Sequence, residues 1–215
     1  MIEYIVPGNI DDRILTRAAK LLGEGGIAAL PTDTNWSIVC SIRSREGLKR
    51  LKSLSGMRDE RHFTLLCSSI SQFGEFCSLD NTRFRLIKRL TPGPYVFILK
   101  TLLGTEKALG LRRKEIGVRL PGNPIPVSLI ETLKCPLYSI TAKREMAAGE
   151  NGSSDDDSFY REETLFEGGW ELEGITGLDI ILDSGEDRSR IFSTVLDLIE
   201  DEVTMIRQGA GEWPV

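Results

Sequence analysis

The sequence predicts an α/β fold built on a mixed sheet. Three observations lead to this class. Short apolar runs typical of strands alternate with helical patterns over most of the 215 residues. The composition, 40% hydrophobic and 27% charged, is that of an ordinary globular protein with ample core. No internal repeat interrupts the alternation, and the length suits one large domain or two small ones.

The first half of the chain carries clear start and stop signals for its elements. Residues 4–8 (YIVPG) open as a short strand. A helix capped by Asn9 or Asp11 then runs to about Leu22, where three glycines end it, and its apolar stripe comprises Ile14, Leu15, Ala18, Ala19 and Leu22. The further elements expected are strands on both sides of residues 32–34, a helix at 45–54, a strand at 62–69 and a helix at 81–90.

The second half continues the alternation. The elements expected are strands at 95–101 and 116–121, a helix at 124–134 that begins at a proline, and strands at 135–142, 179–185, 193–199 and 203–209. Residues 146–163 differ, because they are polar, acidic and rich in Gly and Ser. We interpret them as a surface loop. Their acidic run, 155–157, could bind a metal ion, but it lacks the glycine and the closing glutamate of a calcium loop.

The stretch Thr32-Asp33-Thr34 lies between two apolar runs. A two-residue hairpin turn favours Asn-Gly or Asp-Gly, because its central residues need positive φ, which neither threonine tolerates well. We therefore expect this stretch not to be a plain hairpin tip.

Charge and cysteine usage narrow the classes of protein. The net charge of −5, from 27 basic and 32 acidic residues, argues against a dedicated nucleic-acid binder, although a local basic face remains open. The sequence has neither a signal-peptide pattern nor 18 consecutive apolar residues, so we expect no membrane span and a cytoplasmic location. The four cysteines form no Cys-x-x-Cys pair, and His62 is the one histidine. A structural zinc site is therefore not expected, and a catalytic triad would have to use His62.

Polar residues follow several predicted strands, and ligands of open α/β sheets bind beyond strand ends. Arg119 and Arg207 could fork onto phosphate or carboxylate oxygens, which suits an anionic ligand. Each arginine could equally be a solvated rim residue, and the hydroxyls could simply cap backbone groups. The two common phosphate loops, G-x-x-x-x-G-K-[ST] and G-x-G-x-x-G, are absent. The strand-end stretches are 32–34, 91–94, 119–121, 139–142, 193–194 and 207–209.

Seven motifs follow one another along the chain: LPTDTNWSIVC, HFTLLC, LTPGPYVFILK, GVRLPGNPI, LYSITA, STVLDL and IRQGAG. Together they resemble the YrdC/YciO family, whose enzymatic members are threonylcarbamoyl-AMP synthases, and HFTLLC and TPGPYVFILK are most similar to the YciO branch. The resemblance implies a single domain over residues 1–215, with a twisted open sheet and helices around a concave, positively charged cavity. It also implies that L-threonine, bicarbonate and ATP with Mg²⁺ react to threonylcarbamoyl-AMP and pyrophosphate. A partner enzyme would then transfer the threonylcarbamoyl group to tRNA.

The resemblance also implies which side chains form the site. Thr32 and Thr34 would offer hydroxyls near the threonine substrate, and Asp33 would order the turn or face the substrate amine. The nucleotide side would comprise Arg119, Ser139, Thr141, Ser193 and Arg207. No catalytic residue and no resident metal ligand is assigned.

This chain departs from the family pattern where charge matters. The family has a basic-x-basic pair for the threonine carboxylate and phosphate oxygens, and the corresponding residues here are Ser53 and Ser55. Losing two charge-assisted hydrogen bonds, roughly 3–6 kcal/mol, would weaken the site by about two to four powers of ten. Lys143 replaces a family amide and could either add a cation near the phosphates or point to solvent. The cations that could fill the gap are Lys52, Arg58 and Arg61, unless all three are solvated.

Two functions therefore remain open from the sequence. One is a threonylcarbamoyl-AMP synthase, with activity weakened by the missing cations or with an altered acyl-acceptor substrate. The other is a non-catalytic member of the family that binds double-stranded RNA or a nucleotide. The carbamoyl-transfer module of hydrogenase maturation also uses this domain, but the cysteine pairs of its zinc fingers are absent here.

Overall fold

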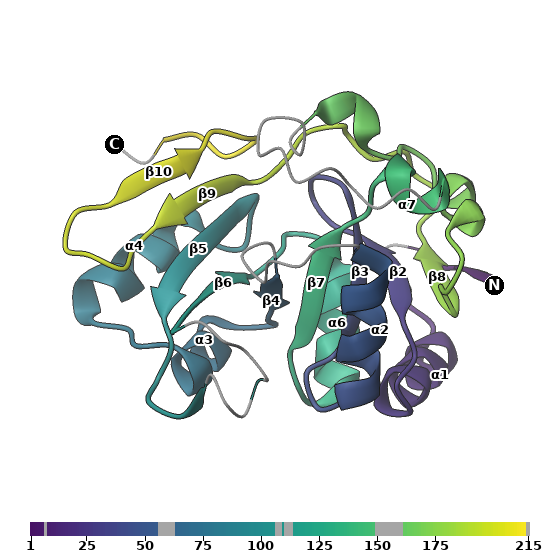
Figure 1. The fold of residues 1–215 in the computed structure, drawn as a ribbon, viewed down its shortest axis with the longest axis horizontal. Coiled ribbons are helices and arrows are strands. Elements are labelled where there is room, and N and C mark those ends of the chain that lie inside the picture. Colours follow the sequence, from purple (N-terminus) through teal and green to yellow (C-terminus); the bar gives the residue numbers. More distant parts are fainter. Residues whose placement is uncertain (7, 56–62, 106–108, 110–113, 149–160, 214–215) are drawn as a thin grey trace.

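The strands form one mixed sheet, as expected. The computed structural model describes residues 1–6, 8–55, 63–105, 109, 114–148 and 161–213. Within these ranges ten strands are ordered β1-β8-β2-β3-β7-β4-β6-β5-β9-β10 (Figure 1). Four neighbouring pairs are parallel and five are antiparallel, which confirms the mixed α/β class. The strands are β1 (Ile2–Tyr4), β2 (Ala28–Pro31), β3 (Trp36–Ser41), β4 (Thr64–Leu66), β5 (Tyr95–Lys100), β6 (Glu115–Arg119), β7 (Leu137–Thr141), β8 (Ile180–Asp183), β9 (Thr194–Asp197) and β10 (Thr204–Arg207).

Helices cover both faces of this sheet. The described helices are α1 (Asp12–Gly23), α2 (Arg45–Ser55), α3 (Ile70–Phe76), α4 (Asn81–Leu90), α6 (Pro124–Leu133), α7 (Arg144–Ala148) and two short 3₁₀ turns, η3 (Glu162–Thr164) and η4 (Gly169–Gly174). Four helices begin at a side-chain cap, because Asp11, Ser69, Asp80 and Asn123 each accept a hydrogen bond from a backbone N–H in the first turn. The predicted starts of α1 and α4 are therefore confirmed.

The alternation of side chains along the strands divides the core into two apolar layers. On β3, Trp36 and Ile38 pack into the layer that also holds residues of α2, α3 and α4, whereas Val39 packs into the layer beneath α1 and α6. All six residues of β3 are buried. A sheet covered on both faces explains why its central strands read as continuous apolar runs.

Residues 32–34 are not a plain hairpin tip, as expected, but they lie in a longer hairpin loop. Strands β2 and β3 pair antiparallel, with Pro31 opposite Trp36, so the chain does form a hairpin. Its loop has four residues, Thr32 to Asn35, and neither threonine adopts positive φ. A longer loop removes the need for Asn-Gly, and the Thr32 hydroxyl accepts hydrogen bonds inside the turn instead.

Other differences from the expected elements are local. The strand expected at 62–69 is limited to β4, because Ser69 already caps α3, a helix that the sequence did not predict. The surface loop expected at 146–163 begins inside α7 and ends in η3, while its residues 149–160 lie outside the described ranges. No helix among the described residues has the length and apolar character needed to cross a membrane.

Candidate active site

The β2–β3 turn is held together by one threonine hydroxyl. Thr32 Oγ1 accepts from the backbone N–H groups of Thr34 and Asn35, each at 3.2 Å, and donates to the Asn35 carbonyl at 2.7 Å. The hydroxyls of Thr32 and Thr34 lie 3.1 Å apart. Both threonines are almost completely buried. The turn therefore presents fixed hydroxyls and one carboxylate, that of Asp33.

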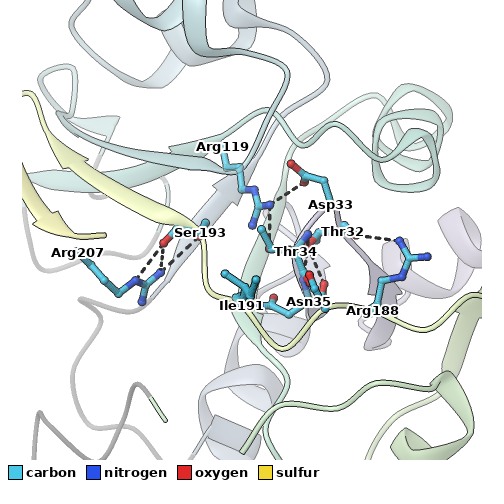
Figure 2. Close-up of polar contacts among 10 residues, drawn as sticks. Thr32, Asp33, Thr34, Asn35, Arg119, Arg188, Ile191, Ser193 and Arg207 are labelled. Carbon is cyan, nitrogen blue, oxygen red and sulfur yellow. Dashed lines mark hydrogen bonds and ion pairs between the residues drawn. The ribbon is translucent and has the colours of Figure 1, made fainter. Parts of the chain in front are cut away.

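Arg119, the last residue of β6, reaches this turn from another part of the sheet (Figure 2). Its Nη2 donates to Asp33 Oδ1 at 2.7 Å and to Thr34 Oγ1 at 3.0 Å. The Arg119 side chain is 5% exposed and that of Asp33 is 19% exposed. Burial lowers the pKa of Arg119, and the neighbouring Asp33 carboxylate opposes that effect. The contacts thus place Arg119 beside the turn, although the family resemblance implied a position on the nucleotide side.

The Arg119–Asp33 pair leaves two polar atoms over. Arg119 Nε and Asp33 Oδ2 are both buried, and neither has a hydrogen-bond partner among the described residues. Gly122 borders the carboxylate, since a Cβ at that position would lie 3.5 Å from Asp33 Oδ2. Buried polar atoms normally have partners, so one spare donor and one spare acceptor at the same place favour a bound ligand that carries both kinds of group.

Arg207, the last residue of β10, is fixed on Ser193. Its Nε and Nη2 donate to the Ser193 carbonyl at 3.0 and 2.7 Å, and its guanidinium lies over the Phe192 ring at 4.9 Å from the centroid. Ser193 is followed directly by β9. In Figure 2 the Arg119 and Arg207 side chains both extend toward the region between the turn and Ser193.

Strand β7 and the residues after it contribute the other side chains that the family resemblance assigns to the nucleotide side. In β7, Ser139 is buried opposite Val39, and Thr141 lies opposite Ser37. Lys143 is 1% exposed. Burial lowers the pKa of Lys143 to about 8, the Glu145 carboxylate opposes the shift, and the positive charge of Arg207 adds to it. Lys143 is therefore buried rather than pointing to solvent, and it is close enough to Arg207 for their charges to repel.

A hydrogen bond connects the turn, which holds Arg119, to the segment that leads to Ser193 and Arg207. Asn35 Nδ2, from the turn, donates to the Ile191 carbonyl at 3.1 Å. Two residues later Ser193 accepts from Arg207. The structure thus brings together the turn, Arg119, Ser193 and Arg207, although they are far apart in sequence.

The residues at the end of α2 are divided between surface and interior. Ser53 is exposed, whereas Ser55 is buried and donates to the Lys52 carbonyl at 2.9 Å. Arg58 and Arg61 lie outside the described residues. No contact described for Lys52 or the two serines joins them to the turn, so their place in the site stays a prediction.

Sequence reasoning did not single out Asn35, the last residue of the turn, or two residues that donate to the turn from outside it. These two are Arg188, whose Nη1 donates to the Thr32 carbonyl at 3.4 Å, and Ser189, whose hydroxyl donates to the Thr34 carbonyl at 2.7 Å. Only Asn35 had a local signal, because it directly follows the singled-out stretch. The described residues include no group of three or more His, Cys, Asp or Glu side chains that could hold a metal ion.

Comparison with known proteins identifies the family. Residues 20–209 match the family model Sua5_yciO_yrdC, described as telomere recombination. The uncharacterized protein YciO of Escherichia coli K12 is 30% identical over 210 residues, which cover 97% of this chain and 95% of that protein. The crystal structure of E. coli YciO superposes with a TM-score of 0.78 and covers 99% of this chain and 97% of the other.

Threonylcarbamoyl-AMP synthases are also related. The mouse enzyme of that name is 26% identical over 199 residues, which cover 92% of this chain and 67% of that protein. The structure of Pyrococcus abyssi Sua5 complexed with L-threonine has a TM-score of 0.79 at 22% identity, and it covers 97% of this chain and 57% of the other. At that identity the likeness shows a shared fold. Sequence and structure together establish that this chain belongs to the Sua5/YciO/YrdC family.

Proposed function

We propose that this protein is an L-threonylcarbamoyladenylate synthase, which converts L-threonine, bicarbonate and ATP into threonylcarbamoyl-AMP, pyrophosphate and water. Membership of the family and the similarity to the mouse enzyme support the reaction. The observation that carries the proposal is the buried Arg119–Asp33 pair, with its spare Nε donor and its spare Oδ2 acceptor.

An amino acid carries the two groups that these atoms lack as partners. Its amino group can donate to Asp33 Oδ2, and its carboxylate can accept from Arg119 Nε, so a cation and an anion on one carbon would complete both partners. The Thr34 hydroxyl lies at the same turn and suits a side-chain hydroxyl, whereas the Thr32 hydroxyl is already used inside the turn. The ammonium group must lose a proton before its nitrogen can attack the carbon of bicarbonate, and the step then gives a carbamate, water and that released proton.

The second step requires a polyanion beside the first substrate. Lys143 and Arg207 repel each other, and the negative charge of a triphosphate would offset this repulsion. Mg²⁺ arrives with ATP as part of the substrate. The carbamate oxygen then forms a bond to the α-phosphorus as the bond to pyrophosphate breaks, and the two cations stabilise the leaving group. The tRNA threonylcarbamoyl-transfer proteins that the resemblance implies would consume the product.

The test is release of pyrophosphate by the purified protein. We expect release only when threonine, bicarbonate and MgATP are all present, together with a product of the mass of threonylcarbamoyl-AMP. Asp33→Asn should reduce synthesis at least tenfold, because a charge-assisted bond to the amine is worth about 1.5–3 kcal/mol. The absence of both synthesis and threonine binding would overturn the proposal.

The serines at the end of α2 provide a second test. If Ser53 and Ser55 occupy the positions of the family's cations, Ser53→Lys with Ser55→Arg should raise synthesis at least tenfold over the native protein. Because Ser55 is buried, the arginine must displace its surroundings, and the double variant should also lose folding stability. The variant with Ser53→Lys alone separates the two effects, since Ser53 is exposed.

Binding titrations, run beside the assay of pyrophosphate release, decide the non-catalytic alternative. Binding of MgATP or of a double-stranded RNA without pyrophosphate release, in the native and the double-substituted protein, would assign the chain to the binding members of the family. The similar YciO proteins are themselves uncharacterized, so this outcome is tested alongside the synthase reaction.

A further inference from the structure

One stretch of the chain contacts both the β2–β3 turn and Arg207. We call residues 188–193 the crossing segment, since they pass from the turn to β9 (Figure 2). At its start, Arg188 and Ser189 donate to the carbonyls of Thr32 and Thr34. At its end, Phe192 and Ser193 hold the guanidinium of Arg207. Its middle residue, Ile191, accepts from the turn residue Asn35.

The contacts of the crossing segment add to the hydrogen bonding of the turn. The internal bonds of the turn use its amides, the Thr32 hydroxyl and the Asn35 carbonyl. The carbonyls of Thr32 and Thr34 take no part in these internal bonds, and the crossing segment supplies a donor to each. The bond from Ser189 Oγ is the shorter of the two, at 2.7 Å. The Thr32–Asp33 and Thr34–Asn35 peptide groups are therefore held from outside the hairpin.

The crossing segment is itself anchored. The Arg188 backbone N–H donates to the Glu167 carbonyl at 2.9 Å, and the same carbonyl accepts from the buried Trp36 indole at the same distance. The Arg188 side chain is 13% exposed and pairs with Glu186 at 2.6 Å. Trp36 follows the turn directly, so the Glu167 carbonyl ties the crossing segment to the residue next to the turn.

We propose that Ser189 is a positioning residue, which holds the Thr34 peptide so that Thr34 Oγ1 and the Asp33 carboxylate face Arg119. Ser189 itself contacts neither Arg119 Nε nor Asp33 Oδ2, the two atoms that are proposed to bind the amino acid. It acts through the turn, and its consequence for threonine binding rests on the proposed function. A neutral hydrogen bond of this kind corresponds to about a fivefold change in an equilibrium constant.

The first measurement does not depend on any enzymatic activity. Amide hydrogen exchange of the ligand-free protein is followed by NMR for Thr34 and Asn35 in the native protein, Ser189→Ala and Ser189→Thr. We expect exchange at both amides to be about fivefold faster in Ser189→Ala and native-like in Ser189→Thr, which keeps the hydroxyl. The matched control is Thr132→Ala, which deletes a hydroxyl-to-carbonyl bond of 2.9 Å on the exposed side of α6 and should leave both amides unchanged.

The second measurement is the synthase assay with the same four proteins. Ser189→Ala should raise the KM for threonine about fivefold, with the KM for ATP and kcat within twofold of native. Unchanged exchange in Ser189→Ala would overturn the proposal, and so would an equal rise of both KM values, because that is the signature of general loosening. If the native protein has no synthase activity but exchange responds as expected, Ser189 still positions the turn and the proposed function alone fails.

Discussion

Replacing Asp33 by asparagine should show how much the buried Arg119 guanidinium depends on its counter-charge. Arg119 cannot lose its proton at neutral pH, and its side chain is only 5% exposed. Removing one partner of such a pair costs about 3–5 kcal/mol of unfolding free energy, because the remaining charge stays buried. The reverse change, Arg119→Met, should cost less, about 1.5–3 kcal/mol, since the Asp33 side chain is 19% exposed and its carboxylate can be rehydrated.

The double variant completes the thermodynamic cycle. Asp33→Asn with Arg119→Met carries neither charge, so it should be more stable than Asp33→Asn alone, with a coupling energy on the order of 2 kcal/mol. Urea unfolding at pH 7, followed by circular dichroism, gives the four free energies. Losses that simply add in the double variant, or an Asp33→Asn variant more stable than Arg119→Met, would refute the reasoning.

Three further predictions concern other charged and thiol groups. Arg207→Ala should raise the Kd for MgATP about tenfold to a hundredfold, measured by calorimetry, and an unchanged Kd would remove Arg207 from the nucleotide site. Because burial lowers the pKa of Lys143 from 10.5 to about 8, the folded protein releases this proton before the unfolded chain does. Between pH 8 and pH 10.5 the unfolding free energy of the native protein should therefore rise by about 3 kcal/mol relative to that of Lys143→Met. Urea unfolding measures both proteins, and a difference between them that does not change with pH would contradict this. Burial raises the pKa of Cys40 and of Cys77 to about 12, so iodoacetamide at pH 8 should label both in urea and neither in the native protein, as read by mass spectrometry.

Local signals were sufficient for most elements of the fold. The helix expected at 81–90 coincides with α4, because Asp80 caps its start and Pro92 follows its end closely. The β2–β3 hairpin was harder to predict, because the rule for two-residue turns does not apply to a four-residue loop. The sequence did not reveal α3, since the strand expected at 62–69 included Ser69, which is the cap of this helix.

The site was only partly predictable, because its contacts join distant residues. Asp33 pairs with Arg119 across 86 positions, and the Ser189–Thr34 bond spans 155. No periodicity or capping rule reports such pairings, so the sequence placed individual residues at strand ends without saying which of them meet. Ser189 carries no local signal at all. Lys143 illustrates the same point, because its burial follows from the packing around it rather than from its neighbours in sequence.

The order of the strands has a consequence for synthesis of the protein on the ribosome. The turn is made early, but the crossing segment that binds two of its carbonyls and the strand that supplies Arg207 are made some 150 residues later. At about 5–20 residues per second, the nascent chain spends roughly ten to thirty seconds with the turn present and its later partners not yet translated. Under the proposed function, we expect affinity for the substrates only when β9 and β10 have joined the sheet, and ligand binding by stalled nascent chains of increasing length would test this.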